Sequence, residues 1–197
     1  MCLKLVKEFI ALQKNVAYVD FDLQFSSLLQ NLDRQEYVHM SDSGKLHVVQ
    51  PPDDILDFVT VMAGYKLPRG GVVILDSLNS LQSLLTDKRT NQGSKEANQK
   101  TALIVTVLQN ISRFHNNSFL IINLTKARPK SLNRDTSSFW EKTLVGGRMI
   151  KFKSDAILSL KNDSRDSPLI KVAVQESRGR PLSDLKDSVY EFRVPDL

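Results

Sequence analysis

The sequence predicts an α/β fold in which a mainly parallel sheet is flanked by helices and followed by antiparallel strands. Two uninterrupted apolar runs, at residues 72–75 and 119–122, have the pattern of strands that are covered on both faces. Helical patterns alternate with strand patterns in the earlier part of the chain, and three short strands finish it. This order is typical of a parallel sheet with a β-rich edge.

The first elements alternate between helix and strand. We expect a helix over residues 3–13, because its apolar side chains recur on one face. A strand over 16–20, a helix over 25–32 and a strand over 45–49 follow, and Pro51 and Pro52 stop the last of these. Asp53 and Asp54 then begin a helix that runs to residue 63, since acidic residues suit the first turn of a helix.

The later elements follow the apolar strand at 72–76. Polar residues predict loops over 86–100 and 126–138, while 102–114 reads as a helix. The buried stripe of this helix is expected at Leu103, Val107, Leu108, Ile111 and Phe114. Residues 118–123 predict a fully buried strand, and 140–152 a partly helical segment. Strands at 156–160, 169–175 and 189–194 are expected to extend the sheet in antiparallel fashion.

Composition places the chain among ordinary globular proteins. Its 197 residues are 41% hydrophobic and 25% charged, which suits one domain with a real core. The net charge of +5 favours an anionic partner such as nucleic acid. A single cysteine, Cys2, excludes an internal disulfide and suits a reducing compartment, the cytoplasm or the nucleus. No apolar stretch reaches the roughly 18 residues that span a membrane, and no zinc-ligand spacing or nucleophile elbow is present.

Asp76 and Ser77 come directly after the apolar run at 72–75. Because ligands of open α/β sheets bind at the carboxyl ends of the strands, this carboxylate and hydroxyl are candidates for holding Mg²⁺ and a nucleotide. A strand-terminal aspartate also caps the turn that follows it. Both interpretations of Asp76 stay open at this stage.

Several segments in this order resemble the RecA/RadA recombinase core, including its KaiC-like relatives and the recombinase paralogues. They are residues 18–25 (YVDFDLQF), 72–81 (VVILDSLNSL), 119–123, 140–160, 171–181 and 190–194. The resemblance covers nearly the whole chain. It therefore implies a single RecA-like core domain over residues 1–197, with the P-loop type of architecture.

The phosphate loop of that family, Gly-x-x-x-x-Gly-Lys-Ser/Thr, does not occur in the sequence. In the family this loop precedes the first core helix, here expected at residue 3, so the first central strand is missing with it. The chain could continue upstream, a neighbouring chain or a rearranged segment could fill the gap, or the sheet could have adapted to the loss.

Two further positions depart from the family pattern. Asp22 stands where the family carries a catalytic glutamate, which would make it a degenerate general base, although a structural role is favoured. Leu124 replaces the glutamine that senses the γ-phosphate, and leucine cannot hydrogen-bond to phosphate. The resemblance thus implies a degenerate DNA-dependent ATPase, with ATP and Mg²⁺ at Asp76 and Ser77 or with no cofactor at all.

Basic residues gather in the two polar loops, which correspond to the DNA-binding loops of recombinases. The resemblance implies that these residues contact single- or double-stranded DNA. The alternative interpretation is that they lie in solvated loops without a ligand. Arg178 and Arg180 could form a finger that reaches a neighbour's nucleotide, or could lie in a hairpin turn. The DNA-binding candidates are Lys88, Arg89, Lys95, Lys100, Lys126, Arg128, Lys130 and Arg134.

The resulting hypothesis is a divergent recombinase paralogue that binds DNA or a recombinase partner in homologous recombination or repair, without hydrolysing ATP alone. We expect a homo- or hetero-oligomer and no membrane partner. One alternative is an ATPase whose phosphate loop lies upstream or is supplied in trans. The other is a Walker-deficient scaffold subunit of a ring, similar to the RecA-like subunits of Elongator.

Overall fold

The computed structural model describes residues 2–31, 45–50, 69–86, 93–123, 125–129, 140–144, 150, 153–162, 169–177 and 189–193. The chain divides into two compact units, one over residues 2–146 and the other over 147–197. The helix expected over 53–63 lies outside the described residues. None of the described helices is long and apolar enough to cross a membrane.

A four-stranded parallel sheet forms the centre of the first unit. Its strands are β1 (Val16–Asp20), β2 (Leu46–Val49), β3 (Val72–Asp76) and β4 (Ser118–Ile121), in the order β2-β1-β3-β4. Each neighbouring pair is parallel and in continuous register. The prediction of an α/β fold with a parallel sheet is therefore confirmed at this level.

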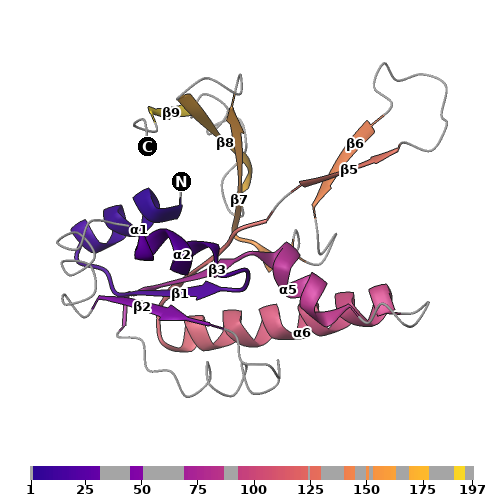
Figure 1. Cartoon of the computed structure of the whole chain (residues 1–197), viewed down its shortest axis with the longest axis horizontal. Coiled ribbons are helices and arrows are strands. Elements are labelled where there is room, and N and C mark those ends of the chain that lie inside the picture. Colours follow the sequence, from indigo (N-terminus) through magenta and orange to yellow (C-terminus); the bar gives the residue numbers. More distant parts are fainter. Residues whose placement is uncertain are drawn as a thin grey trace. The chain divides into compact units, whose positions relative to one another are not determined.

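Helices flank this sheet (Figure 1). Helices α1 (Cys2–Ala11) and α2 (Gln24–Gln30) lie on one side of the strands, and α6 (Gly93–Phe114) lies on the other. The short helix α5 (Leu78–Leu85) follows β3 and packs against α6. Because both faces are covered, β1 and β3 read as continuous apolar runs in the sequence.

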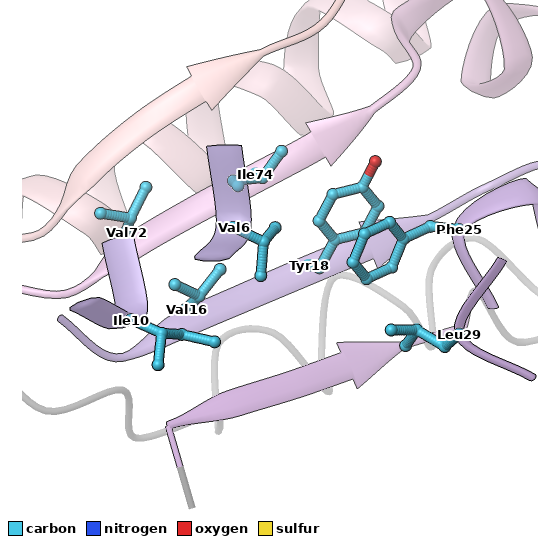
Figure 2. Packing of buried hydrophobic residues seen from close by; sticks show 8 residues of the cluster. All are labelled: Val6, Ile10, Val16, Tyr18, Phe25, Leu29, Val72 and Ile74. Carbon is cyan, nitrogen blue, oxygen red and sulfur yellow. The ribbon is translucent and has the colours of Figure 1, made fainter. Parts of the chain in front are cut away.

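The core on the α1 and α2 side joins both helices to β1 and β3 (Figure 2). Tyr18 of β1 stacks on Phe25 of α2, with ring centroids 3.8 Å apart and planes inclined by 16°. Both rings are almost completely buried, and stacked aromatic pairs stabilise a fold by about 0.5–1.5 kcal/mol beyond their buried area. The cluster also contains Val6, Ile10, Val16, Leu29, Val72 and Ile74.

Helix α6 begins earlier than the sequence predicted, and it buries a different face. Residues 93–100 are helical although a loop was expected there, while 87–92 lie outside the described residues. Leu103 and Phe114 are 63% and 84% exposed, so two members of the expected stripe were wrong. The buried positions Ala97, Thr101, Ile104, Val105, Leu108 and Ser112 recur at helical spacing. Small and polar side chains on that face concealed it from a pattern based on large apolar residues.

Strand β4 is half-buried rather than fully buried, which corrects a second prediction. Its only described neighbour is β3, so it is the outermost of the described strands on that side of the sheet. The apolar run was recognised correctly as a strand, but its position in the sheet depends on the order of the strands and not on its own sequence.

A two-stranded antiparallel ribbon stands where a loop and a partial helix were expected (Figure 1). Strand β5 (Thr125–Pro129) pairs with β6 (Trp140–Leu144). Pairing supplies backbone hydrogen bonds to a polar segment that looks like a loop in isolation. Residues 145–152 belong to the segment that was expected to be partly helical, and the structure describes only Ile150 among them.

The second unit contains an antiparallel meander of three strands. They are β7 (Ala156–Asn162), β8 (Leu169–Ser177) and β9 (Val189–Arg193), in the order β7-β8-β9. The three strands and their antiparallel pairing confirm the sequence prediction. They form a sheet of their own, whereas an extension of the parallel sheet was expected.

Candidate functional site

The carboxyl ends of β1 and β3 bring three aspartates to one end of the sheet. Asp20 and Asp76 are partners in the parallel register, and the Phe21 N–H donates to the Asp76 backbone oxygen at 2.8 Å. Asp22 follows two residues after β1. The chain therefore places Asp22 and Asp76, the two carboxylates singled out in the sequence, at the same end of the sheet as Ser77.

The Asp76 carboxylate is held by side chains from two other elements. The Tyr18 hydroxyl of β1 donates a hydrogen bond to Oδ2, and the Cys2 thiol at the start of α1 donates to the same oxygen at 3.5 Å. Tyr18 cannot swing away easily, because its ring is buried and stacked on Phe25. Asp76 thus ties the first turn of α1 to the ends of both central strands.

Burial raises the pKa of Asp76 above its usual value. The hydrogen bonds from Tyr18 and Cys2 act in the opposite direction, and the negative charges of Asp22 and Asp20 add to the increase. Burial also raises the pKa of the Tyr18 hydroxyl and of the Cys2 thiol. Both groups therefore keep their protons at neutral pH and serve as donors to the carboxylate.

Asp20 has a structural task. Its side chain is completely buried, and Oδ2 accepts hydrogen bonds at 2.7 Å from both the N–H and the hydroxyl of Ser26. Oδ1 lies 3.4 Å from the Phe25 N–H. Leu23, the N-cap residue of α2, makes no side-chain cap bond, so Asp20 satisfies the first turn of the helix from the preceding strand.

A second, smaller hydrogen-bond network at the same end of the sheet joins Asp22, Ser77 and Ser80. Ser77 is the N-cap of α5, and its hydroxyl accepts from the Ser80 N–H at 3.2 Å. The two serine hydroxyls are 2.8 Å apart, and the Ser80 hydroxyl donates to Asp22 Oδ2 at 3.3 Å. Asp22 is exposed, so this contact connects the surface carboxylate to the start of α5.

The described residues do not by themselves make a magnesium site. Within the described parts of the chain, no group of three or more His, Cys, Asp or Glu side chains could hold a metal ion. Asp76 accepts two hydrogen bonds from within the chain, and the Ser77 hydroxyl caps a helix. Mg²⁺ prefers octahedral oxygen ligands, and the arrangement offers it two side chains that already have other tasks.

Only part of the expected DNA-binding set lies within the described residues. Lys95 and Lys100 are exposed in the first turns of α6, with Glu96 exposed beside them. Lys126 and Arg128 belong to β5, where Arg128 is the register partner of Glu141. The remaining candidates and the sensor position lie outside the described residues: Lys88, Arg89, Leu124, Lys130, Arg134, Arg178 and Arg180.

The residues that hold Asp76 were missed in the sequence. Tyr18 carried one signal, because a tyrosine inside a fully buried strand needs a hydrogen-bond partner for its hydroxyl. Cys2 carried none beyond its place at the start of a helix. A comparison with models of known protein families finds no match to this chain, and a comparison with curated proteins finds none either.

Proposed function

We propose that this chain is a RecA-like accessory factor that binds DNA or a recombinase partner in homologous recombination or repair, without hydrolysing ATP alone. The observation that carries the proposal is the set of hydrogen bonds that the Asp76 carboxylate accepts from within the chain. A carboxylate at the end of a central parallel strand is the place for a nucleotide-bound metal, yet here Tyr18 and Cys2 occupy it.

The raised pKa of Asp76 supports the same conclusion. A carboxylate whose ionised form is disfavoured by burial and by two neighbouring carboxylates is a weaker ligand for a cation. Asp76 then has a structural role, because its hydrogen bonds connect α1 and β1 to β3. The sheet is retained as a platform for binding.

The DNA-binding part of the proposal rests on charge. The chain carries a net charge of +5, and Lys95 and Lys100 are exposed on α6. Flexible lysines that neutralise phosphates release counterions, which gives salt-dependent and sequence-independent affinity.

The test is binding of a fluorescent single-stranded oligonucleotide over a salt series, with and without ATP·Mg²⁺. We expect affinity that falls as salt rises and is indifferent to nucleotide. The DNA-binding arm fails if there is no binding at low salt; a ring scaffold of the Elongator kind would behave that way. Nucleotide-dependent binding or turnover contradicts the accessory role.

An ATPase completed by a phosphate loop from elsewhere is the second candidate. Asp22 and Asp76 lie at the same strand ends, and the Asp22 charge is felt by Asp76. Hydrolysis that appears only after a candidate partner protein is added, and disappears in an Asp22→Asn variant, would favour this candidate over the first.

A further inference from the structure

The amino ends of the four parallel strands carry a row of basic side chains. Lys45 comes directly before β2, Lys14 two residues before β1, and Arg69 three residues before β3. Arg113 lies in the last turn of α6, which leads into β4. Lys45 is half-buried and the other three side chains are exposed. Because parallel strands begin at the same end of a sheet, the four residues gather at that end, at the tails of the strand arrows in Figure 1.

Side-chain contacts join the first three of these residues into one surface. The Lys45 ammonium donates a hydrogen bond to the side-chain oxygen of Gln13, the neighbour of Lys14. The Lys14 ammonium lies 3.9 Å from the position that a Cβ on Gly70 would occupy. It therefore reaches across to the turn that holds Arg69, and the three charges lie next to one another.

The row continues toward β4 through the backbone. The Gly70 N–H donates to the Asn116 oxygen at 3.1 Å, and the Asn116 N–H donates to the Arg113 oxygen at 3.0 Å. Three spacings between neighbouring strands add up to about 14 Å. Successive phosphates of one DNA strand are about 3.4 Å apart along the helix axis, so the row is long enough to face several of them.

The two ends of this sheet differ in charge. The segments of the row contain four lysine or arginine residues, one histidine and no acidic residue; they are residues 12–15, 45, 69–71 and 113–117. The carboxyl ends of the central strands carry Asp20 and Asp76 instead. Like charges on neighbouring strands repel each other in the free chain. A polyanion that neutralises them removes this repulsion and releases its own counterions.

Stabilisation of helix ends accounts for only one member of the row. The C-terminal end of a helix carries partial negative charge that favours a cation, and Arg113 lies in the last turn of α6. Helix α1 has no basic residue in its last turn, and Lys45 and Arg69 precede strands. A ligand with several negative charges accounts for the arrangement of the others.

We propose that this basic row binds the sugar-phosphate backbone of single-stranded DNA. The inference rests on the DNA-binding part of the proposed function and adds a second contact surface to it. Lys95 and Arg113 are 18 residues apart in α6, which is about 27 Å along the helix axis. The row is therefore separate from the lysines in the first turns of α6. Lysine and arginine bind phosphates without reading bases, so this contact is independent of sequence.

The experiment is fluorescence anisotropy of a labelled oligo(dT) with the whole chain over a salt series. The test variant replaces Lys14, Lys45 and Arg69 by glutamine, which removes three charges and keeps the side chains polar. We expect its affinity at about 50 mM salt to fall roughly tenfold. The slope of log K against log salt should fall by about 0.7 for each phosphate that is no longer neutralised. A control with Lys14→Arg, Lys45→Arg and Arg69→Lys keeps the charges and should bind like the native chain.

Urea denaturation of the same variants separates binding from a structural role. If the row serves a polyanion, removal of like charges should leave the unfolding midpoint unchanged or raise it. Arg69→Gln alone, at an exposed position, should reduce the salt slope by about 0.7 and keeps the test decisive if the triple variant does not fold.

Three results would overturn the proposal. The first is native affinity and native slope in the glutamine variants, which would leave the DNA-binding part of the proposed function intact and place the contact elsewhere. The second is a lower unfolding midpoint with unchanged binding, which would mean that the row neutralises acidic groups or helix ends of the chain itself. The third is a native chain that does not bind oligo(dT) at low salt, and this result alone would also remove the DNA-binding part of the proposed function.

Discussion

At the scale of single residues, Asp76 shows how a carboxylate at the end of a parallel strand can take a structural role. Its place at the end of β3 is suited to a metal, but its partners are Tyr18 and Cys2. Each partner is a protonated donor because burial raises its pKa. The stability of the strand ends therefore depends on this network.

Tyr18→Phe should lower the free energy of unfolding by about 1.5–3 kcal/mol, the usual contribution of a hydrogen bond to a charged group. The ring and its stacking on Phe25 are kept, so the decrease reports on the hydroxyl. Urea denaturation measures it. In an Asp76→Asn background the same substitution should cost less, and an equal cost in both backgrounds would show that the hydroxyl acts elsewhere.

Asp76 should also give stability an unusual dependence on pH. Its folded pKa is raised above the ordinary 3.8, so the folded state holds this proton more tightly than the unfolded state. The contribution is complete below the unfolded pKa and is lost as pH rises through the folded pKa. Compared with Asp76→Asn, the native chain should lose stability over that window in urea titrations at several pH values. A constant difference between the two proteins would contradict this prediction.

At the scale of elements, the start of α2 carries strain that a single substitution can relieve. Leu23 has a φ of 60°, in the left-handed region, and its side chain is 51% exposed. This conformation costs a non-glycine residue about 1–2 kcal/mol. Leu23→Gly should therefore raise the free energy of unfolding by about 1 kcal/mol.

Thermal or urea denaturation measures this gain, and Gln30→Gly is the matched control. That residue is exposed in the last turn of α2, where the backbone is right-handed, so glycine should only lower the free energy of unfolding, by at most about 1 kcal/mol. If both substitutions destabilise the chain equally, the left-handed residue is not a source of strain.

Helix α6 carries two of the described candidates for DNA binding, Lys95 and Lys100. Replacing Lys95 and Lys100 together by alanine should weaken single-stranded DNA binding and reduce the slope of log K against log salt by about 0.7 for each phosphate that is no longer neutralised. Replacement of both residues by arginine keeps the charge and should preserve the slope. An unchanged slope in the alanine variant would mean that other residues bind the DNA.

At the scale of the whole molecule, the proposed function predicts indifference to nucleotide. A ligand that binds only the folded state at a concentration 100 times its dissociation constant adds about 2.7 kcal/mol to the free energy of unfolding. We expect no such gain when ATP·Mg²⁺ is added to about 1 mM in a thermal unfolding experiment. A rise in melting temperature with ATP·Mg²⁺, absent with Mg²⁺ alone, would show a working nucleotide site.

Prediction from sequence succeeded where local pattern decides structure. The apolar run at 72–75 identified β3 as a buried parallel strand, because a strand covered on both faces needs apolar residues at every position. Asp76, with Ser77 after it, was also placed at the carboxyl end of this strand, which follows from the strand boundary alone. The ribbon of β5 and β6 was missed, because its strands are stabilised by each other rather than by their composition.

The sequence by itself determined the α/β class, the strands of the parallel sheet and the place of Asp76 at the end of one of them, since each depends on residues that are neighbours along the chain. Only the tertiary structure decided which face of α6 is buried, that β4 is the outermost of the described strands on its side, and which groups hold Asp76. Tyr18 and Cys2 are 58 and 74 residues away from Asp76. Contacts at such separation arise from the order and packing of elements, and no local periodicity encodes them.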